Sequence, residues 1–297
     1  MGISPLTSQL CFGFGNQVDL MNSHFTIGIC QIKVAGDKKE NLAKARAMIN
    51  EAATRGSQMV ILPEMFNCLY QESLFPAFAE EYPAGPTFQM LAETAREEGI
   101  YLVGGSVPER DGPALYNSSF AFDPRGRLMA RHRKAHLFDV AIAGGISFQE
   151  SKTLSRGMEI TVVKTALCTF GLAICYDIRF PELARLMALE GAEMIILPGA
   201  FNMTTGPAHW ELLLRSRAVD NQVYLVGAAP ARDLAARYLS FGHSAVVDPW
   251  GRVVARADEK ETIIYAGIDL ALVAKVRREL PLLHHRRTDL YELKKKQ

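Results

Sequence analysis

Cys175 is a candidate nucleophile in this chain of 297 residues. We expect it to end a buried strand, directly before the segment Tyr176-Asp-Ile-Arg-Phe-Pro-Glu182. A turn between a strand and a helix can hold a side chain out of the sheet, beside backbone N–H groups. Because the thiolate and not the thiol attacks carbonyl carbons, a base or a cation must lie close to it. On its own, a buried structural cysteine is the better interpretation, since free cysteine is among the most buried residue types.

Three charged residues could supply the base and the cation. Glu64 follows the apolar segment 59–63, where little water surrounds a carboxylate, and this suits a general base. Lys134 lies in the basic segment 131–139 and could lower the pKa of a thiol or stabilise an oxyanion. Glu150 is an acid in an otherwise uncharged loop. Each has an ordinary alternative, namely an ion-paired or capping Glu64, a solvated Lys134 and a surface Glu150.

Taken together, these segments resemble the nitrilase superfamily of carbon–nitrogen hydrolases. Leu62-Pro-Glu-Met65, Arg133-Lys-Ala-His136 and Cys175-Tyr-Asp-Ile-Arg-Phe-Pro-Glu182 resemble its glutamate, lysine and cysteine motifs. Further segments resemble the omega-amidase branch of that family: 134–139, 148–155, 198–211, 215–222 and 242–251. The resemblance spans residues 25–291 and leaves out the N-terminal extension.

The resemblance implies an α-β-β-α sandwich with mixed sheets, paired through its helices into a homodimer. It implies that Glu64 is the base, that Cys175 attacks the amide, and that Lys134 and the backbone N–H of Tyr176 hold the oxyanion. Glu150 would position Lys134 or the substrate. The implied reaction converts 2-oxoglutaramate or 2-oxosuccinamate to the 2-oxo dicarboxylic acid and ammonia through a cysteine thioester. Another amidase of the superfamily, a nitrilase or an N-carbamoyl amino acid hydrolase is the alternative.

A substrate of this kind carries a carboxylate, which needs a cation or several donors when it is buried. Arg179 is our candidate, because a guanidinium can bind a carboxylate through two parallel hydrogen bonds. An ion pair between Arg179 and Glu182 is the structural alternative. Tyr70, Tyr176 and Phe201 complete the predicted substrate-binding set.

Two other classes of protein stay open at this stage. A papain-like hydrolase would take its base from a histidine, and His136, His209 and His243 are available. A non-catalytic partner-binding protein is the other class. The first predicts that replacing a histidine abolishes activity, and the second predicts no acyl-thioester on Cys175.

Strand and helix patterns alternate along the chain. We expect strands at 25–32, 59–62, 101–103, 172–175, 194–197, 223–226 and 263–268, and hairpins at 115–132 and 244–256. Helices are expected at 37–56, 88–98, 181–191, 209–220 and 270–279, the first opening with a capping box at Asp37 and Glu40. The mixture predicts a layered α/β fold with a mixed sheet in one carbon–nitrogen hydrolase domain, residues 24–297. Residues 1–23 are predicted to be a flexible, dispensable extension.

Composition narrows the partners and the compartment. Lys and Arg total 33 against 32 acids, a net charge of +1, which disfavours nucleic acid as a partner. The basic residues at 277–287 are interpreted as a solvated surface. Five cysteines without a CxxC pair disfavour a disulfide framework and a metal site, and reduced thiols favour the cytoplasm. The first 32 residues contain no Lys or Arg, unlike a secretory or mitochondrial signal, and no apolar run is long enough for a membrane helix. No cofactor is expected.

Overall fold

The computed structural model describes residues 24–296. The predicted N-terminal extension at 1–23 lies outside these residues, so its boundary and its dispensability stay predictions. Each predicted strand and helix within the described range has a counterpart in the structure, although several bounds differ by a few residues.

The first sheet mixes parallel and antiparallel strands. Its order is β15-β1-β2-β3-β5-β4, and β6 also pairs with β5. Strands β1, β2 and β3 run parallel, whereas the other pairings are antiparallel. The bounds are β1 His24–Gln31, β2 Met59–Ile61, β3 Tyr101–Val103, β4 Val107–Asp111, β5 Ala114–Phe122, β6 Leu128–Arg133 and β15 Thr262–Asp269.

The second sheet repeats this plan with six strands in the order β14-β13-β12-β11-β10-β9. Its three parallel strands, β10, β11 and β12, lie in the centre. The bounds are β9 Thr161–Lys164, β10 Thr169–Leu172, β11 Met194–Pro198, β12 Tyr224–Ala228, β13 Ala245–Val247 and β14 Val253–Arg256. Both sheets therefore direct the carboxyl ends of parallel strands to an edge where loops can meet.

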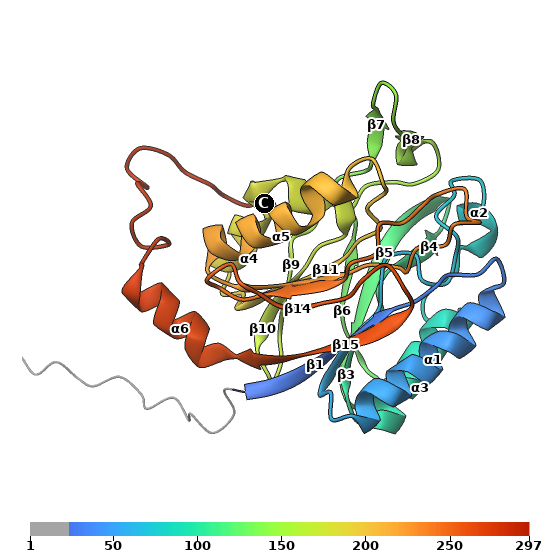
Figure 1. Cartoon of the computed structure of the whole chain (residues 1–297), viewed down its shortest axis with the longest axis horizontal. Helices are drawn as coiled ribbons and strands as arrows, with labels where there is room; N and C mark the ends of the chain where they lie inside the picture. The colour runs from blue at the N-terminus through green and yellow to red at the C-terminus, as the bar shows by residue number, and fades with distance from the viewer. Residues whose placement is uncertain (1–23, 297) are drawn as a thin grey trace, which may run out of the picture.

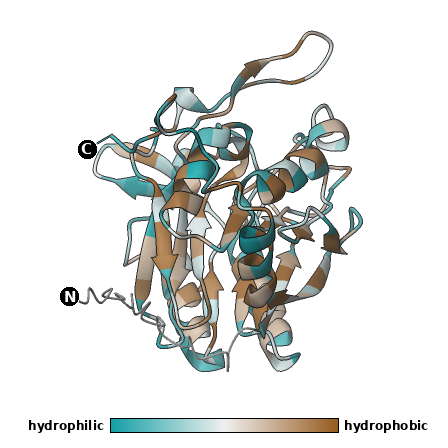
Figure 2. Ribbon diagram, turned by 90° about the vertical axis from the view of Figure 1, so that its left-hand side faces the viewer, coloured by the Kyte–Doolittle hydropathy of each residue, from teal (hydrophilic) through white to brown (hydrophobic). Residues whose placement is uncertain are grey.

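The two sheets pack face to face between two layers of helices (Figure 1). One buried cluster joins alternate residues of both sheets, among them Ile29 and Ile61 from the first and Leu172 and Ile196 from the second. Helices α1 (Lys38–Thr54) and α3 (Pro86–Glu98) cover the outer face of the first sheet, and α4 (Pro181–Leu189) and α5 (Gly206–Asn221) cover that of the second. Hydropathy colouring shows apolar strands in the middle of the molecule (Figure 2). The predicted α-β-β-α sandwich is confirmed.

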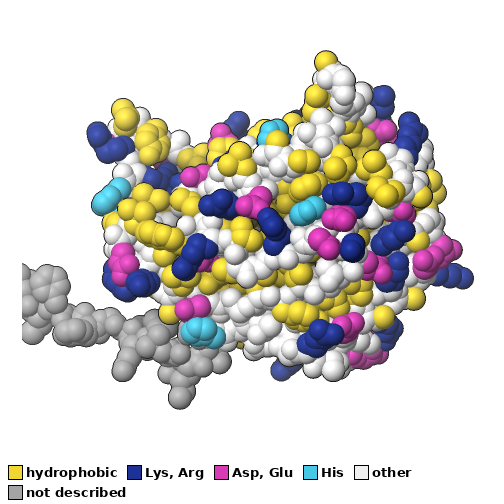
Figure 3. All heavy atoms as spheres, in the orientation of Figure 1, with side chains coloured by type: hydrophobic (Ala, Val, Ile, Leu, Met, Phe, Trp, Pro, Cys, Tyr) yellow, Lys and Arg dark blue, Asp and Glu magenta, His cyan; other side chains and the backbone are white. Residues whose placement is uncertain are grey.

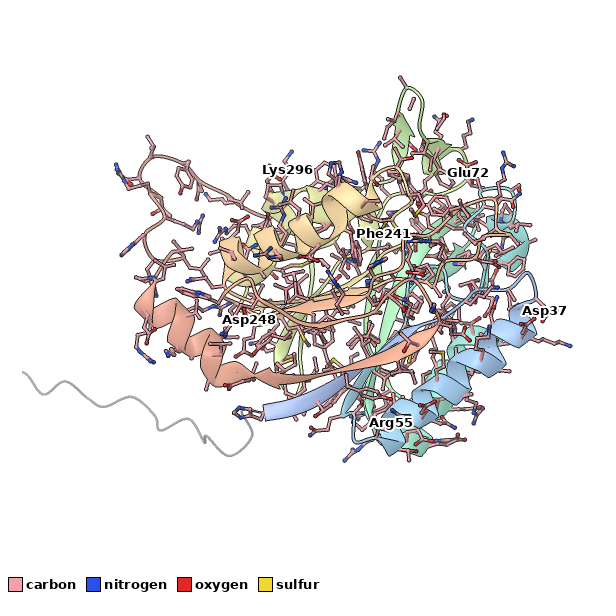
Figure 4. All side chains as sticks on the ribbon, viewed as in Figure 1. Asp37, Arg55, Glu72, Phe241, Asp248 and Lys296 are labelled. Atoms are coloured by element: carbon pink, nitrogen blue, oxygen red, sulfur yellow. The ribbon has the colours of Figure 1, made fainter. Side chains whose placement is uncertain are left out.

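Local signals explain the helix ends. The Asp37 carboxylate accepts a hydrogen bond from the Glu40 backbone N–H at 2.9 Å, so the predicted cap opens α1. Asp37 and Arg55 mark the two ends of this helix in Figure 4. Pro181 opens α4, where its missing N–H costs no helical hydrogen bond.

Several segments depart from the predictions. Strand β10 ends at Leu172, and Cys175 instead opens a 3-10 turn at Cys175–Arg179. The strand cannot continue through Cys175, because this residue has a positive φ. Strands β4 and β9 were missed. A small hairpin of β7 (Asp139–Ala141) and β8 (Ser147–Gln149), also missed, projects from the body of the molecule (Figure 1). The remaining helical elements of residues 24–296 are α2 (Phe75–Phe78), α6 (Leu270–Glu279) and a 3-10 turn at Glu150–Lys152.

Surface charge, helix length and possible metal ligands were each predicted from the composition. On the face drawn in Figure 3, acidic and basic side chains are interspersed, as expected from the balanced charge. Within residues 24–296 no helix combines the length and apolarity needed to cross a membrane. The same residues contain no group of three or more His, Cys, Asp or Glu arranged to hold a metal ion.

Candidate active site

Four predicted residues converge from four different segments. Glu64 follows β2, Lys134 follows β6, Glu150 opens the turn after β8, and Cys175 opens the turn after β10. All four side chains are buried. The contacts below show that the fold brings them into one charged cluster between the two sheets.

Lys134 is the centre of this cluster. Its Nζ lies 3.1 Å from Glu64 Oε1 and 2.9 Å from the Glu150 carboxylate, and its side chain is 0% exposed. Burial alone would lower the pKa of this ammonium, but the carboxylates of Glu150 and Glu64 outweigh burial and raise its pKa well above the ordinary value. Lys134 therefore keeps its charge and can stabilise an oxyanion.

The Glu64 carboxylate is held by donors from both sheets. Oε1 accepts a hydrogen bond from Asn117 Nδ2 at 2.8 Å, and Oε2 accepts one from the backbone N–H of Ala200 at 2.7 Å. Asn117 lies on β5 and Ala200 follows β11. Sequence reasoning missed Asn117, although a polar amide in the middle of an apolar strand is a usable signal. A carboxylate fixed in this way is oriented for proton transfer.

Cys175 adopts a strained backbone conformation beside Glu64. Its φ is +47°, a left-handed value that side chains disfavour and that clusters at functional sites. The backbone of Gly199 passes close by, because a Cβ placed there would lie 3.3 Å from Cys175 Cα. Burial and the hydrogen-bonded Glu64 carboxylate raise the pKa of the thiol well above its usual value, and Lys134 opposes this only in part. These surroundings favour the protonated form of the thiol, so a nearby base would be needed to form the thiolate.

Glu150 and Tyr70 complete the cluster. Glu150 Oε1 accepts a hydrogen bond from the Tyr70 hydroxyl at 2.7 Å, and Oε2 accepts one from the backbone N–H of Phe138 at 2.6 Å. Burial and the carboxylates of Glu150 and Glu64 raise the pKa of Tyr70, so its hydroxyl stays protonated. The Tyr70 ring packs 4.6 Å from that of Tyr238, which the sequence reasoning did not single out.

Arg179 lies with two other predicted substrate residues. Its guanidinium is 4.8 Å from the centre of the Phe201 ring and 5.7 Å from that of Tyr176. Its polar side-chain neighbour is His209, whose Nδ1 lies 3.2 Å from Nη1. Among the ion pairs of residues 24–296, none joins Arg179 to Glu182 or to another acid. The structural alternative for Arg179 is therefore not found.

The histidines named for a papain-like dyad have other partners. His136 bonds to Asp177, His209 contacts Arg179, and the His243 Nδ1 lies 2.9 Å from the carbonyl oxygen of Phe241. The groups that shift the pKa of the Cys175 thiol are Glu64, Lys134 and Glu150. Among residues 24–296, no hydrogen bond joins Cys175 to any of these three histidines, so a Cys–His dyad has no support in these contacts.

A cavity of about 50 Å³ adjoins the cluster and reaches Glu64 and Tyr70. Arg237 and Tyr238 also line it. Water occupies polar cavities from about 10–15 Å³ upward, so this one can hold water beside the Glu64 carboxylate.

Comparison with known proteins decides the family. The family model of the carbon–nitrogen hydrolases matches residues 26–278. The chain belongs to the carbon–nitrogen hydrolase family of the nitrilase superfamily. It is therefore a hydrolase that acts on the carbon–nitrogen bonds of amides.

Relatives and solved structures agree with this membership. The chain is 50% identical to "Omega-amidase NIT2" of Danio rerio over 91% of its length and 98% of the relative, and 50% identical to the Homo sapiens protein of that name over 92% and 98%. The crystal structure of Saccharomyces cerevisiae Nit3, a member of branch 10 of the nitrilase superfamily, superposes with a TM-score of 0.83 at 43% identity, covering 89% of this chain and 97% of that one. A mutant amidase from Nesterenkonia sp. AN1, which shows Michael addition of acrylamide at its active site cysteine, superposes with a TM-score of 0.74 at 25% identity over 90% and 98%.

Proposed function

We propose that this protein is an omega-amidase that hydrolyses the terminal amide of 2-oxoglutaramate or 2-oxosuccinamate through a thioester on Cys175. The observation that carries the proposal is the single buried ammonium of Lys134, 3.1 Å from Glu64 and 2.9 Å from Glu150, beside a thiol in a strained turn. The names of relatives that are 50% identical over nearly their whole length support the substrate class.

In the proposed first half-reaction, Glu64 accepts the thiol proton as Cys175 Sγ attacks the amide carbon. The carbonyl oxygen gains negative charge, and the Lys134 ammonium and the Tyr176 backbone N–H stabilise it. The tetrahedral intermediate collapses as the protonated Glu64 donates its proton to the amide nitrogen. Ammonia leaves, and the acid remains as a thioester on Cys175.

In the second half-reaction, Glu64 takes a proton from a water molecule that attacks the thioester. The carboxylic acid leaves, and the proton returns through Glu64 to the cysteine sulfur. Glu150 keeps Lys134 in place, supported by its bonds from Tyr70 and from the Phe138 backbone. The four side chains and the backbone amide supply each group that these steps require, so the proposal invokes no cofactor.

Arg179 is the proposed holder of the substrate carboxylate. It has no acid partner among the described ion pairs and lies over the Phe201 ring, near the thiol. Phe201 and Tyr176 would form the walls of the pocket, and Tyr70 would offer its hydroxyl. A guanidinium in this setting can form two parallel hydrogen bonds to the carboxylate.

The test compares two substrates in three proteins. Ammonia release from 2-oxosuccinamate and from an uncharged amide of similar length is measured for the wild type, Arg179→Met and Arg232→Met. Arg232 is a matched control, because it also lies near an aromatic ring, 5.8 Å from the centre of Phe241, but bonds to backbone carbonyls. Arg179→Met should lose about 2–5 kcal/mol in kcat/KM on the charged substrate and little on the neutral one. Arg232→Met should affect both substrates alike.

Two outcomes would contradict the proposal. Equal losses on both substrates in Arg179→Met would assign this arginine to structure. A wild-type preference for the neutral amide, for a ureido acid or for a nitrile would replace the omega-amidase assignment with another activity of the superfamily.

The proposal extends to assembly and compartment. Leu189, Leu212 and Val219 are exposed apolar side chains on α4 and α5, and Arg185 Nη1 is buried there without a partner. This outward helical surface supports a homodimer, which light scattering of the purified protein would test. Four cysteines of residues 24–296 are free and buried, which suits the reducing cytoplasm, and cell fractionation would test that location.

A further inference from the structure

Asp177 is a buried carboxylate two residues after Cys175, outside the cluster of Glu64, Lys134 and Glu150. Its side chain is 0% exposed and accepts four hydrogen bonds, two at each oxygen. Oδ1 accepts from the backbone N–H of His136 at 2.9 Å and from its Nδ1 at 2.8 Å. Oδ2 accepts from the backbone N–H of Ile174 at 2.9 Å and from His132 Nε2 at 3.3 Å.

These donors come from the two segments that carry the candidate nucleophile and its cation. Ile174 directly precedes Cys175, whereas His132 and His136 lie two residues before and two residues after Lys134. Each oxygen thus holds part of the lysine segment, and Oδ2 also holds the cysteine turn. One carboxylate fixes these segments to each other.

The strained turn requires such a restraint. A residue with a positive φ persists only where its surroundings determine the conformation, and Cys175 has a φ of +47°. The bond from Ile174 to Asp177 spans Cys175, and the backbone N–H of Asp177 returns a bond to the carbonyl of Ile174 at 3.0 Å. The side chain of Asp177 therefore closes the turn that presents the sulfur.

The ionised form of Asp177 is the one that fits this site. Burial alone would raise the pKa of this carboxyl, but hydrogen bonds from His132 and His136 outweigh burial and hold its pKa below the usual range. A carboxylate only accepts hydrogen bonds, so the two imidazole nitrogens that face it carry protons. The other nitrogen of His132 lies 3.0 Å from Thr161 Oγ1, and the His136 ring stacks on Phe180 at 3.7 Å.

We propose that Asp177 is a positioning residue that holds the Cys175 turn against the Lys134 segment and so sets the distance between the sulfur and the ammonium. The effect on turnover rests on the proposed amidase function, but the effect on the reactivity of the thiol does not. Asparagine is the informative replacement. Each oxygen of Asp177 faces two N–H donors, and asparagine replaces one of these oxygens with an NH₂ group. In either orientation of the amide, that NH₂ group would face two N–H donors instead of accepting from them.

The experiment compares Asp177→Asn with the matched control Asp248→Asn. Asp248 is also a buried aspartate in a turn, 1% exposed, and it accepts from the backbone of Trp250 and Arg252 and from Arg252 Nε. It lies in the hairpin between β13 and β14, away from the charged cluster, and is labelled in Figure 4. Three quantities are measured: the melting temperature, kcat and KM for ammonia release, and the rate of acrylamide addition to Cys175 followed by peptide mass spectrometry.

We expect Asp177→Asn to lower kcat about 10²-fold with KM changed less than about threefold, since a displacement of about 1 Å has an effect of that size. Acrylamide addition should slow about tenfold or more, because the base and the thiol lose their alignment. Asp248→Asn should lower the melting temperature and leave both rates unchanged.

A second variant keeps the test decisive if Asp177→Asn does not fold. His136→Phe removes one donor to Asp177 but keeps the backbone N–H and the stacking on Phe180, and it should slow acrylamide addition in the same direction by a smaller factor. Wild-type addition rates in His136→Phe, or in a folded Asp177→Asn, would overturn the proposal. If the wild type releases no ammonia from any amide, the amidase proposal fails, and the acrylamide rates alone decide the role of Asp177.

Discussion

Glu64 and Glu109 are both buried glutamates with 1% of their surface exposed, and both pair with basic residues on or just after β6. Glu109 lies between two guanidinium groups. Arg133 binds it with two hydrogen bonds of 2.8 and 2.9 Å, and Arg131 adds one of 2.7 Å. Glu64 instead shares the single ammonium of Lys134 with Glu150 and lies beside a thiol.

Strand geometry separates these two sites. Successive side chains of a strand point to opposite faces, so Arg131 and Arg133 share one face while His132, and by continuation Lys134, share the other. Glu109, the glutamate of the outer site, has more cationic than anionic neighbours. Its two arginines are 40% and 18% exposed, so water screens their remaining charge. The inner cluster has two carboxylates for one cation, and the side chains of all three are 0% exposed. At the inner site, burial and the neighbouring carboxylates raise the pKa of the Cys175 thiol, whereas the balanced charge at the outer site serves structure.

The largest expected effect tests whether ammonia release at the inner site depends on the sulfur of Cys175. Cys175→Ala should abolish ammonia release while the protein stays folded, because no other group can form the thioester. Cys168→Ala is the matched control, since Cys168 is also buried but lies in the core between the sheets. It should keep its activity and lose some stability. Ammonia release above background in a folded Cys175→Ala protein would falsify the assignment of the nucleophile.

The next effect tests whether Glu64 and Lys134 act as one unit. Glu64→Gln and Lys134→Met should each reduce kcat by about 10²–10⁴-fold, because a base and an oxyanion donor contribute about this much. The double variant should be little worse than either single variant, since each step needs both groups. Stopped-time ammonia assays on the three variants give the comparison. Losses that multiply fully would mean that the two residues work independently.

Sequence patterns predicted the inner site better than the outer one. Glu64, Lys134 and Cys175 lie in segments whose residue types and order resemble those of a known family. In the fold, Lys134 bonds to Glu64, and both residues influence the pKa of the Cys175 thiol. Glu109 was not singled out, because β4 reads Val-Pro-Glu-Arg-Asp and shows no apolar alternation. That strand is recognisable only once it pairs with β5, which brings Glu109 within reach of the arginine side chains of β6. The misplaced end of β10 has a similar cause: the bond from Ile174 to Asp177 bends a segment whose apolar side chains alone resemble a strand.

A smaller effect concerns the hydroxyl of Tyr70, which lies 2.7 Å from Glu150 and 3.3 Å from Lys134. Tyr70→Phe should lower kcat/KM about tenfold to a hundredfold, because a hydrogen bond to a charged group contributes about 1.5–3 kcal/mol. Tyr116→Phe is the control from the outer site, where the ring lies 3.8 Å from the Arg133 guanidinium. Kinetics of both variants on one substrate would separate the sites. An equal loss in Tyr116→Phe would erase the distinction between them.

The smallest effect on catalysis is expected at Glu109 itself. Glu109→Gln keeps the shape of the side chain but leaves Arg131 and Arg133 without their shared carboxylate. Removing one partner of a fully buried pair costs about 3–5 kcal/mol, but these arginines reach water, so about 1–3 kcal/mol of unfolding free energy is the expected loss. Arg133 also keeps its bond to Asp111 at 2.6 Å, which limits its movement.

Because β6 continues directly into Lys134, a shift of the strand would reach the inner site, and kcat would then fall together with stability. Urea unfolding and kcat, measured on the same preparation, distinguish these cases. A loss of stability with kcat within about twofold of the wild type is the expected result, since Lys134 is held separately by the Asn117 carbonyl at 2.8 Å and by its two carboxylates.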